Sequence, residues 1–361
     1  MLPPLLIPPS VQSTVLYNQA VFLVTGLFST LGQQWLHYQG AADARSMLTI
    51  LVTYLGMSAV YVLPDPSKLN RPRSPTILAE SKGPKKRAAL IAVMDVGGNL
   101  VLTAGSFIVG SGLYQVIYAS IVGITAIFSY AFLGRNLTPM GWICVGIIMI
   151  GMSVTALGSS PLPSAGSEHN ILFGFGITLF GTCIYAGVYT INDYLLSGTN
   201  SRMTPRAQCF WVGFYSTLLT LAVIVLVSIP TLRTMPLSEP GVIGMYLALI
   251  ASSLGHNVTY FQLLESTGAV ATGVLQALRA VLVFGLSHLL FCKQDAVQCF
   301  TAAKGVATLI VVAGVIGFSV AKAKKGLPVG MASARVSRSA QSFELLPSAV
   351  DDDDEDPSHV G

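Results

Sequence analysis

Long hydrophobic runs occupy most of this chain, and its polar residues gather in the segments between the runs. A helix needs about 20 mostly apolar residues to cross a bilayer. The runs that approach or exceed this length cover residues 15–38, 46–63, 88–109, 112–133, 138–157, 171–195, 207–229, 241–263, 268–291 and 299–321. We therefore predict an all-α integral membrane protein with ten transmembrane helices.

Two of the connections between these runs are very short. Residues 110–112 lie between the third and fourth runs, and residues 265–267 lie between the eighth and ninth. So short a connection leaves no room for a loop that returns across the membrane. Each of these two pairs should therefore form an antiparallel hairpin.

The composition supports a membrane location and excludes two other classes of protein. Hydrophobic residues make up 52% of the 361 positions and charged residues 10%, against about 25% charged in soluble domains. So few charges cannot cover a soluble enzyme, and the mean hydropathy of +0.67 excludes a disordered chain. The runs hold no zinc-ligand pair, Ser/His dyad or twin catalytic aspartates, so we expect no enzyme, cofactor, metal or nucleic-acid partner.

Lysine and arginine are distributed unequally between the two sides of the predicted bundle. Of the 20 such residues, fifteen fall on the side of the termini, three on the other side and two inside runs. Positive residues collect on the cytosolic side of membrane proteins, so both termini should be cytosolic. The chain then divides into a cytosolic N-terminus (1–14), two five-helix units (15–158 and 171–321) and a disordered cytosolic tail (322–361).

A weak internal repeat relates these two five-helix units. Aligning Gln115 with Gln276 brings Asp95 onto His256, because each lies about twenty residues before its glutamine. A unit of five spans is odd in number, so its second copy crosses the membrane the other way up. Inverted repeats of this kind are typical of secondary transporters, whose substrate lies near the bilayer midplane between the two copies.

Three ionisable residues lie well inside the runs, where a charge costs at least about 2.5–3.5 kcal/mol at a helix centre. Arg279 is near the middle of the ninth run, and its guanidinium matches carboxylate or phosphate in a two-point fashion. It could anchor an anion, or pair with Asp95 as a strut or gate. Asp95 and His256 could carry protons or simply bond neighbouring helices.

These positions predict a central aqueous cavity bounded by the third, fourth, eighth and ninth runs. Its polar and aromatic lining suits a polar organic solute better than a bare ion. The expected substrate-binding residues are Asp95, Asn99, Tyr114, Gln115, Tyr118, His256, Gln276 and Arg279.

Other polar positions leave alternatives open. Asn192 and Asp193, at the cytosolic end of the sixth run, could form a gate or cap a helix. Lys304 should extend out of the membrane. Cys292 and Cys299 flank a loop predicted to face an oxidising compartment, where a disulfide is allowed but not required.

Several of these motifs are familiar in combination. Asp95-x-x-Gly98-Asn-Leu100, Tyr114-Gln115 and Leu278-Arg279 follow one another in this order. The chain resembles the F subgroup of solute carrier family 35 and, more distantly, the chloroquine-resistance transporters, both of the drug/metabolite transporter superfamily. The resemblance implies a ten-helix inverted-repeat carrier that works by alternating access, with Asp95, Gln115 and Arg279 in its cavity.

Relatives in that superfamily carry nucleotide sugars, amino acids, peptides or cationic drugs, and many lie in internal membranes. The chain departs from them at Tyr118, where relatives usually have arginine, and at Asn192-Asp193, where they tend to have paired acids. The resemblance therefore gives the architecture but not the substrate.

We expect a secondary transporter for a small polar organic solute, with or without coupling to protons. A nucleotide-sugar exchanger is one alternative. Another is a membrane scaffold that recruits partners through the basic loop 64–87 and the acidic tail. We expect an internal membrane (Golgi, lysosome or vacuole) rather than the plasma membrane, and a homodimer is left open.

Overall fold

The computed structural model describes residues 9–63, 84–157, 168–197, 203–295 and 298–324. These residues form helices and connections and contain no strand. Most of the predicted N-terminus, the larger part of the basic loop and nearly all of the tail lie outside the described residues. The predictions made for those segments therefore stay predictions.

The helices alternate with short connections along the whole described chain. Those of the first half are α1 (Pro9–Tyr38), α2 (Leu48–Ser58), α4 (Pro84–Ala119), α5 (Ile121–Leu133) and α6 (Pro139–Leu157). Those of the second half are α7 (Glu168–Ser197), α8 (Pro205–Val223), α9 (Ile229–Leu232), α10 (Pro240–Thr267), α11 (Ala269–Phe291) and α12 (Ala302–Lys324). Short 3-10 turns η1 (Ala44–Ser46) and η2 (Ala59–Val62) flank α2, and the π-helical turn η3 (Ile224–Ser228) joins α8 to α9.

Seven helices in the described residues are long and apolar enough to cross a bilayer. Three shorter apolar helices, Leu48–Val62, Ile121–Leu133 and Pro139–Val154, fall below that length. The chain is thus an all-α multi-pass membrane protein, but its full-length spans do not reach the predicted ten. The fourth predicted run is divided at Ser120, whose hydroxyl donates to the carbonyl of Ile117 at 2.6 Å and competes with the helical hydrogen bonds.

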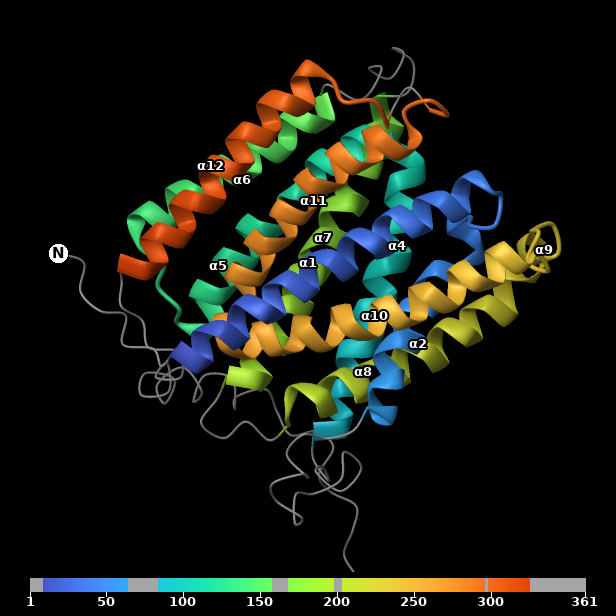
Figure 1. Ribbon diagram of the computed structural model, residues 1–361, viewed down its shortest axis with the longest axis horizontal. Helices are drawn as coiled ribbons and strands as arrows, with labels where there is room; N and C mark the ends of the chain where they lie inside the picture. The colour runs from blue at the N-terminus through green and yellow to red at the C-terminus, as the bar shows by residue number, and fades with distance from the viewer. Residues whose placement is uncertain (1–8, 64–83, 158–167, 198–202, 296–297, 325–361) are drawn as a thin grey trace, which may run out of the picture.

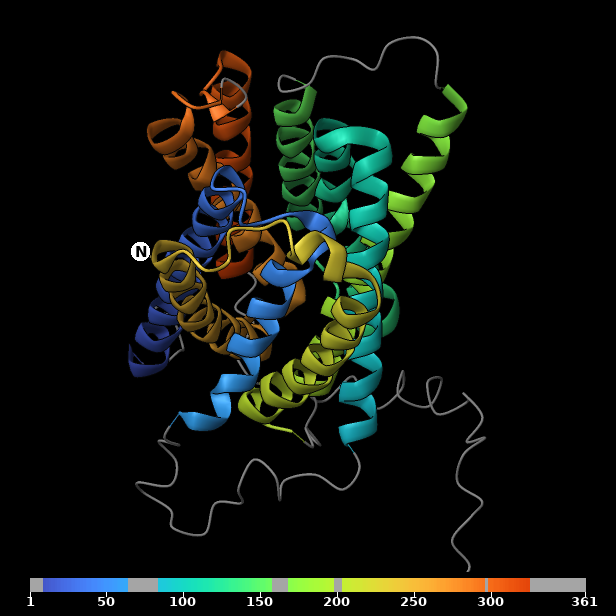
Figure 2. The ribbon, with the colours of Figure 1, turned by 90° about the vertical axis from the view of Figure 1, so that its right-hand side faces the viewer.

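The long helix α4 folds back on itself. Gly98 lies directly against Tyr185 of α7, and the ring of Tyr185 is 6.4 Å from that of Tyr118. Twenty residues of straight helix would separate Gly98 from Tyr118 by about 30 Å. The segment must therefore reverse between them, as the hairpin predicted at residues 110–112 requires. Figure 2 shows the ribbon of α4 bending sharply at its upper end.

The helices pack mainly in pairs from opposite halves of the sequence. α1 packs along α10, α4 along α7, α2 against α8, and α6 along α12. The last pair lies side by side at one edge of the molecule (Figure 1). Glycines let the backbones approach closely, as is common between helices in lipid. A Cβ atom on Gly56 of α2 would lie 2.6 Å from Cβ of Ser253 in α10.

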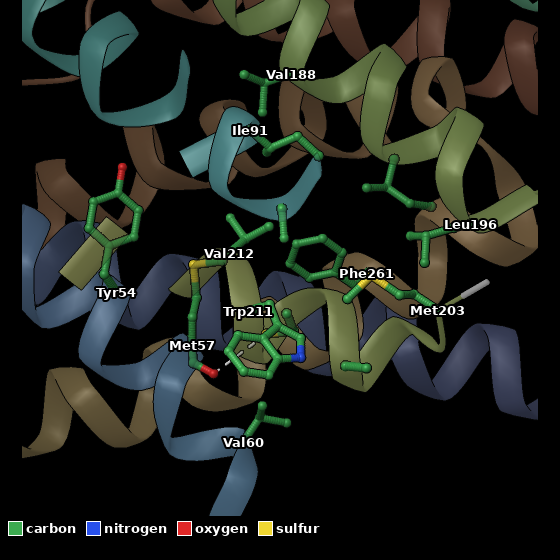
Figure 3. Close-up of a cluster of buried hydrophobic side chains, with 14 of the residues drawn as sticks. Tyr54, Met57, Val60, Ile91, Val188, Leu196, Met203, Trp211, Val212 and Phe261 are labelled. Carbon is green, nitrogen blue, oxygen red and sulfur yellow. Dashed lines mark hydrogen bonds between the residues drawn. The ribbon is translucent and has the colours of Figure 1, made fainter. Parts of the chain in front are cut away.

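Bulky apolar side chains fill the space where α2, α4, α7, α8 and α10 meet. Trp211 and Phe261 lie there among Met57, Val60 and Ile91 (Figure 3). In contrast, large apolar side chains are exposed on the outside of the bundle, including Leu226 (82%), Leu289 (77%) and Leu309 (72%). In a membrane protein such a surface faces the lipid tails, so exposed leucines need no protein partner.

The connection between α11 and α12 is closely tied down. Cys292 and Cys299 form a disulfide, which settles the alternative left open by the sequence. The hydroxyl of Tyr38, at the end of α1, donates to the carboxylate of Asp295 at 2.9 Å. The side chain of Lys304 is buried, and its ammonium reaches back to the connection before α12, where it donates to the carbonyl of Cys299 at 2.9 Å.

Candidate functional site

A cavity of about 330 Å³ lies in the middle of the bundle. Its volume is within the range of pockets for small organic ligands. Side chains of α1, α2, α4, α7, α8, α10 and α11 line it, so it borders on more helices than the four predicted runs. The polar and aromatic lining residues are Ser29, Thr30, Gln33, Thr49, Thr53, Tyr54, Asp95, Asn99, Tyr185, Tyr189, Asn192, Ser253, His256, Asn257, Tyr260, Phe261, Gln276 and Arg279.

Five of the eight predicted site residues line this cavity. They are Asp95, Asn99, His256, Gln276 and Arg279. They come from α4, α10 and α11, which are distant in sequence, so the structure brings together what the sequence only placed in separate runs.

Two of the three predicted residues from the fourth run, Tyr114 and Tyr118, are placed differently. Tyr114 stacks on Tyr118 at 5.7 Å between ring centroids, and neither is among the cavity-lining residues. Tyr185 of α7 occupies that wall instead, with the ring of Tyr118 6.4 Å from it. The two tyrosines are therefore corrected from lining residues to neighbours of the lining. The side chain of Gln115 lies outside the described residues.

One corner of the cavity, between α2, α4 and α7, is built to accept hydrogen bonds. The carboxyl of Asp95 interacts with the side chains of Tyr54 and Tyr185, which line the same part of the cavity. The Nδ2 atom of Asn99 donates to the hydroxyl of Tyr54 at 2.9 Å. An amide N–H can only donate, so the Tyr54 oxygen is the acceptor in this bond. Asp95, whose carboxylate can only accept, lies beside this pair and supplies the acceptor of this corner.

The opposite corner, between α1, α10 and α11, is built to donate. Nη1 of Arg279 lies 3.4 Å from Nε2 of His256, and Nδ1 of His256 lies 3.0 Å from the carbonyl oxygen of Phe22. A carbonyl only accepts, so Nδ1 carries the proton and Nε2 is the acceptor for Arg279. The imidazole also stacks on the ring of Phe22 at 4.3 Å. His256 thus holds Arg279 in place.

Gly26 of α1 allows Arg279 to occupy this position. A Cβ atom on Gly26 would lie 2.6 Å from Cδ of Arg279 and 2.9 Å from Cε1 of His256. Contacts this close require one of the side chains to move. The absence of a side chain at position 26 therefore makes room for the guanidinium beside α1.

Asp95 and Arg279 do not pair with one another. Neither takes part in an ion pair among the described residues, so the structure does not show the pairing on which the strut or gate alternative depended. The physical reason is that they belong to opposite corners of the cavity, each with its own polar neighbours. Tyr189 interacts electrostatically with both charges, and its hydroxyl accepts from Nε2 of Gln276 at 3.3 Å.

A second charged cluster lies where the ends of α7, α10 and α11 meet. Arg135 and Asp193 form an ion pair at 2.8 Å, with the side chain of Asp193 fully buried and that of Arg135 30% exposed. The other oxygen of Asp193 accepts from the backbone N–H of Ala269 at 2.8 Å. The Ser197 hydroxyl adds a third hydrogen bond. Asp193 therefore caps the start of α11, which is not its own helix. Its side chain also connects segments that are distant in the sequence.

The turn between α10 and α11 brings this cluster together. Gly268 has a φ angle of +87°, a conformation that side chains rarely adopt. A Cβ atom there would also collide with the guanidinium of Arg135. Nearby, Asn192 lines the cavity and accepts from Nε2 of Gln208 at 2.9 Å.

Sequence reasoning missed the three tyrosines that contact the predicted polar residues. Tyr54, Tyr185 and Tyr189 all line the cavity. A signal was present for two of them, because Tyr185 and Tyr189 are four residues apart and so share one face of a helix. Nothing of this kind marked Tyr54, because no other tyrosine lies three or four residues from it in its run.

Comparisons with known proteins place the fold but not the family. No family model matches the chain. It is 26% identical over 109 residues to the uncharacterized protein C12G12.12 of Schizosaccharomyces pombe, a match that covers 30% of this chain. The chain spans about a third of that relative's length, 33%.

The chain is also similar to a solved structure described only as the crystal structure of a protein. The two superpose with a TM-score of 0.63 at 16% sequence identity, over 87% of this chain and 98% of the other. At this identity the likeness concerns the fold alone. It extends over nearly the whole of both chains, so this helical arrangement recurs in another protein.

Proposed function

We propose that this protein is a secondary transporter that moves a small polar organic solute across a membrane by alternating access. The observation that carries the proposal is the position of Arg279, in a central cavity without a carboxylate partner among the described residues. A guanidinium at membrane depth is costly unless it meets a partner, water or a ligand. An anionic group on the solute would supply that partner.

The packing of the helices supports two inverted repeats. Exchanging α1 with α7, α2 with α8, the first part of α4 with α10, α5 with α11 and α6 with α12 preserves the main contacts. The pair α1–α10 becomes α7–α4, α1–α11 becomes α7–α5, and α2–α10 becomes α8–α4. The pairs α2–α8, α5–α11 and α6–α12 map onto themselves. A pseudo-twofold relation between two five-span units accounts for this pattern.

The chain crosses the membrane ten times if each of the three shorter apolar helices also spans it. α2 continues into η2, and α5 continues the returning part of α4 after the break at Ser120. Short apolar helices are accommodated by local thinning of the bilayer at a modest cost. The drug/metabolite transporter architecture suggested by the sequence has this number of spans.

A side-chain contact joins two helical segments at each end of the molecule, and the two contacts are related in a way that suits alternating access. At one end Asp193 of α7 bonds Arg135, which follows α5. At the other end Tyr38 of α1 bonds Asp295, which follows α11. The repeat exchanges α1 with α7 and α5 with α11, so it also exchanges these two side-chain contacts. We assign the Arg135 end to the cytosol, following the distribution of lysine and arginine.

Uptake into liposomes tests the proposal. Purified protein would be reconstituted and offered a mixed metabolite pool, and the accumulated solutes would be identified by mass spectrometry. We expect selective uptake that Arg279→Gln reduces by about 30-fold or more, because it removes the charge that faces the anion. Arg233→Gln is the matched control, because Arg233 is exposed in the connection after α9 and should have no effect.

The outcomes separate the alternatives. Uptake that rises when the liposomes are preloaded with a nucleoside monophosphate would identify a nucleotide-sugar exchanger. Dependence on a pH gradient would identify proton coupling. If folded wild-type protein accumulates nothing, or Arg279→Gln transports normally, the proposed function is wrong, and the scaffold interpretation takes its place.

A further inference from the structure

The cavity holds two groups of opposite charge type that face the same space. Asp95, with Tyr54 and Tyr185, forms the accepting corner, and Arg279, with His256, forms the donating corner. Both corners border the single cavity described above. A solute in this cavity therefore meets an acceptor on one side and a donor on the other.

Each corner has hydrogen-bonding capacity left over. A carboxylate offers about four acceptor sites, and the two tyrosine hydroxyls that interact with Asp95 could fill at most two of them. A guanidinium carries five N–H donors, and the hydrogen bond to His256 uses one of them. The remaining acceptors at Asp95 suit a protonated amine, and the remaining donors at Arg279 suit a carboxylate or phosphate.

The space between the corners is neither blocked nor neutralised. Asp95 and Arg279 form no ion pair with one another among the described residues. Tyr189 lines the same cavity and interacts electrostatically with both of them. The neighbouring Gln276 leaves its Oε1 atom without a hydrogen-bond partner among the described residues. Polar groups thus continue from one corner to the other.

From this arrangement we infer that the transported solute is a zwitterion, with its protonated amine at Asp95 and its anionic group at Arg279. The inference rests on the proposed function and specifies its substrate class. A solute with both charges neutralises both corners, whereas a simple acid or amine leaves one corner buried without its partner. Leaving a buried charged group unsatisfied is costly, so the site should reject the singly charged analogues.

Reconstituted full-length protein can test this with matched sets of solutes. The pool contains α-amino acids, ω-aminocarboxylates and ω-aminophosphonates of increasing length. Each is accompanied by the acid that lacks the amine and the amine that lacks the acid. We expect uptake of at least one zwitterion to exceed that of both its analogues by roughly tenfold or more. Carboxylates and phosphonates are separate arms, so the result also names the anionic group.

Variants connect the preference to the residues. Asp95→Asn should bring the ratio of zwitterion to matched acid close to one, because the amine loses its partner. A merely structural role would lower the uptake of both solutes equally. Glu265→Gln is the control, since Glu265 is exposed at the last turn of α10 and should leave the ratio unchanged.

Two results would overturn the inference, and they differ from failure of the proposed function. If the preferred solute carries only one charge, the zwitterion is wrong while transport stands. If Asp95→Asn keeps the full zwitterion preference, the assignment of the amine to Asp95 is wrong. If folded protein takes up no solute at all, the proposed function and this inference both fall.

Discussion

The central cavity and the cluster at the end of α7 use the same residue types for opposite purposes. Asp193 and Arg135 are 2.8 Å apart, and a backbone N–H and a hydroxyl complete the set of partners around Asp193. Asp95 and Arg279 are held apart, and each is supported only by neutral groups. The paired cluster joins segments of the protein, whereas the unpaired charges leave capacity for something that is not protein.

This difference shows how the role of a buried charge can be inferred from its partners. A carboxylate satisfied by an arginine and two hydrogen bonds contributes to cohesion and specificity of packing. A buried charge whose only polar neighbours are tyrosine or histidine side chains lowers the stability of the protein. Such a charge is expected to persist where it recognises a ligand. The following three changes break or sharpen this comparison, from the largest expected effect to the smallest.

Asp193→Asn should destabilise the protein most. It removes the charge that offsets Arg135 and weakens the acceptor of Ala269. Breaking a buried pair by one partner costs about 3–5 kcal/mol, and we expect about 2–4 kcal/mol because Arg135 is 30% exposed. Thermal unfolding in detergent would measure the loss.

The control for this change is a double-mutant cycle. Arg135→Gln combined with Asp193→Asn removes both charges, so the double variant should lose less stability than the sum of the two single variants. Additive losses would contradict a direct coupling between the two side chains.

Gly26→Ala should impair transport by about tenfold with little loss of stability, because the new methyl group pushes Arg279 and His256 from their places. Uptake and thermal unfolding would be measured on the same preparation. Gly146→Ala in α6 is the matched control, because a Cβ atom there meets nothing within 4 Å. Equal uptake by the two variants would show that the position of Arg279 does not matter for transport.

Tyr189→Phe should have the smallest effect of the three. It deletes the hydroxyl that accepts from Gln276 and interacts with both charges, at a cost of about 1 kcal/mol, or roughly fivefold in uptake. Tyr130→Phe provides the comparison, because Tyr130 is exposed on the outer surface of α5. A normal rate for Tyr189→Phe would place the solute away from this wall.

A large part of the fold could be predicted from the hydrophobic pattern. The all-α multi-pass class is confirmed, since apolar runs of this length have few other stable arrangements. Lengths were less certain: the run 112–133 contains a break at Ser120, because the serine side chain competes locally with helical hydrogen bonds. The repeat and the ten crossings remain part of the proposal.

The sequence predicted several individual residues of the candidate site but not their arrangement. Asp95, His256 and Arg279 were found because ionisable residues inside apolar runs are conspicuous. Tyr54 was missed because tyrosine is common in membrane helices and its partner lies 45 positions away in the sequence. Tyr118 was misplaced because the wall it was expected to form is supplied by α7.

The sequence by itself determined that this protein lies in a membrane and that charges are buried within it, because both follow from the local composition of single helices. The tertiary structure decided which charges meet. Asp193 reaches the N–H of Ala269 76 positions away, while Asp95 and Arg279 face a common cavity without touching. Such pairings depend on how helices from the two halves pack, and therefore on distances that no local pattern of residues contains.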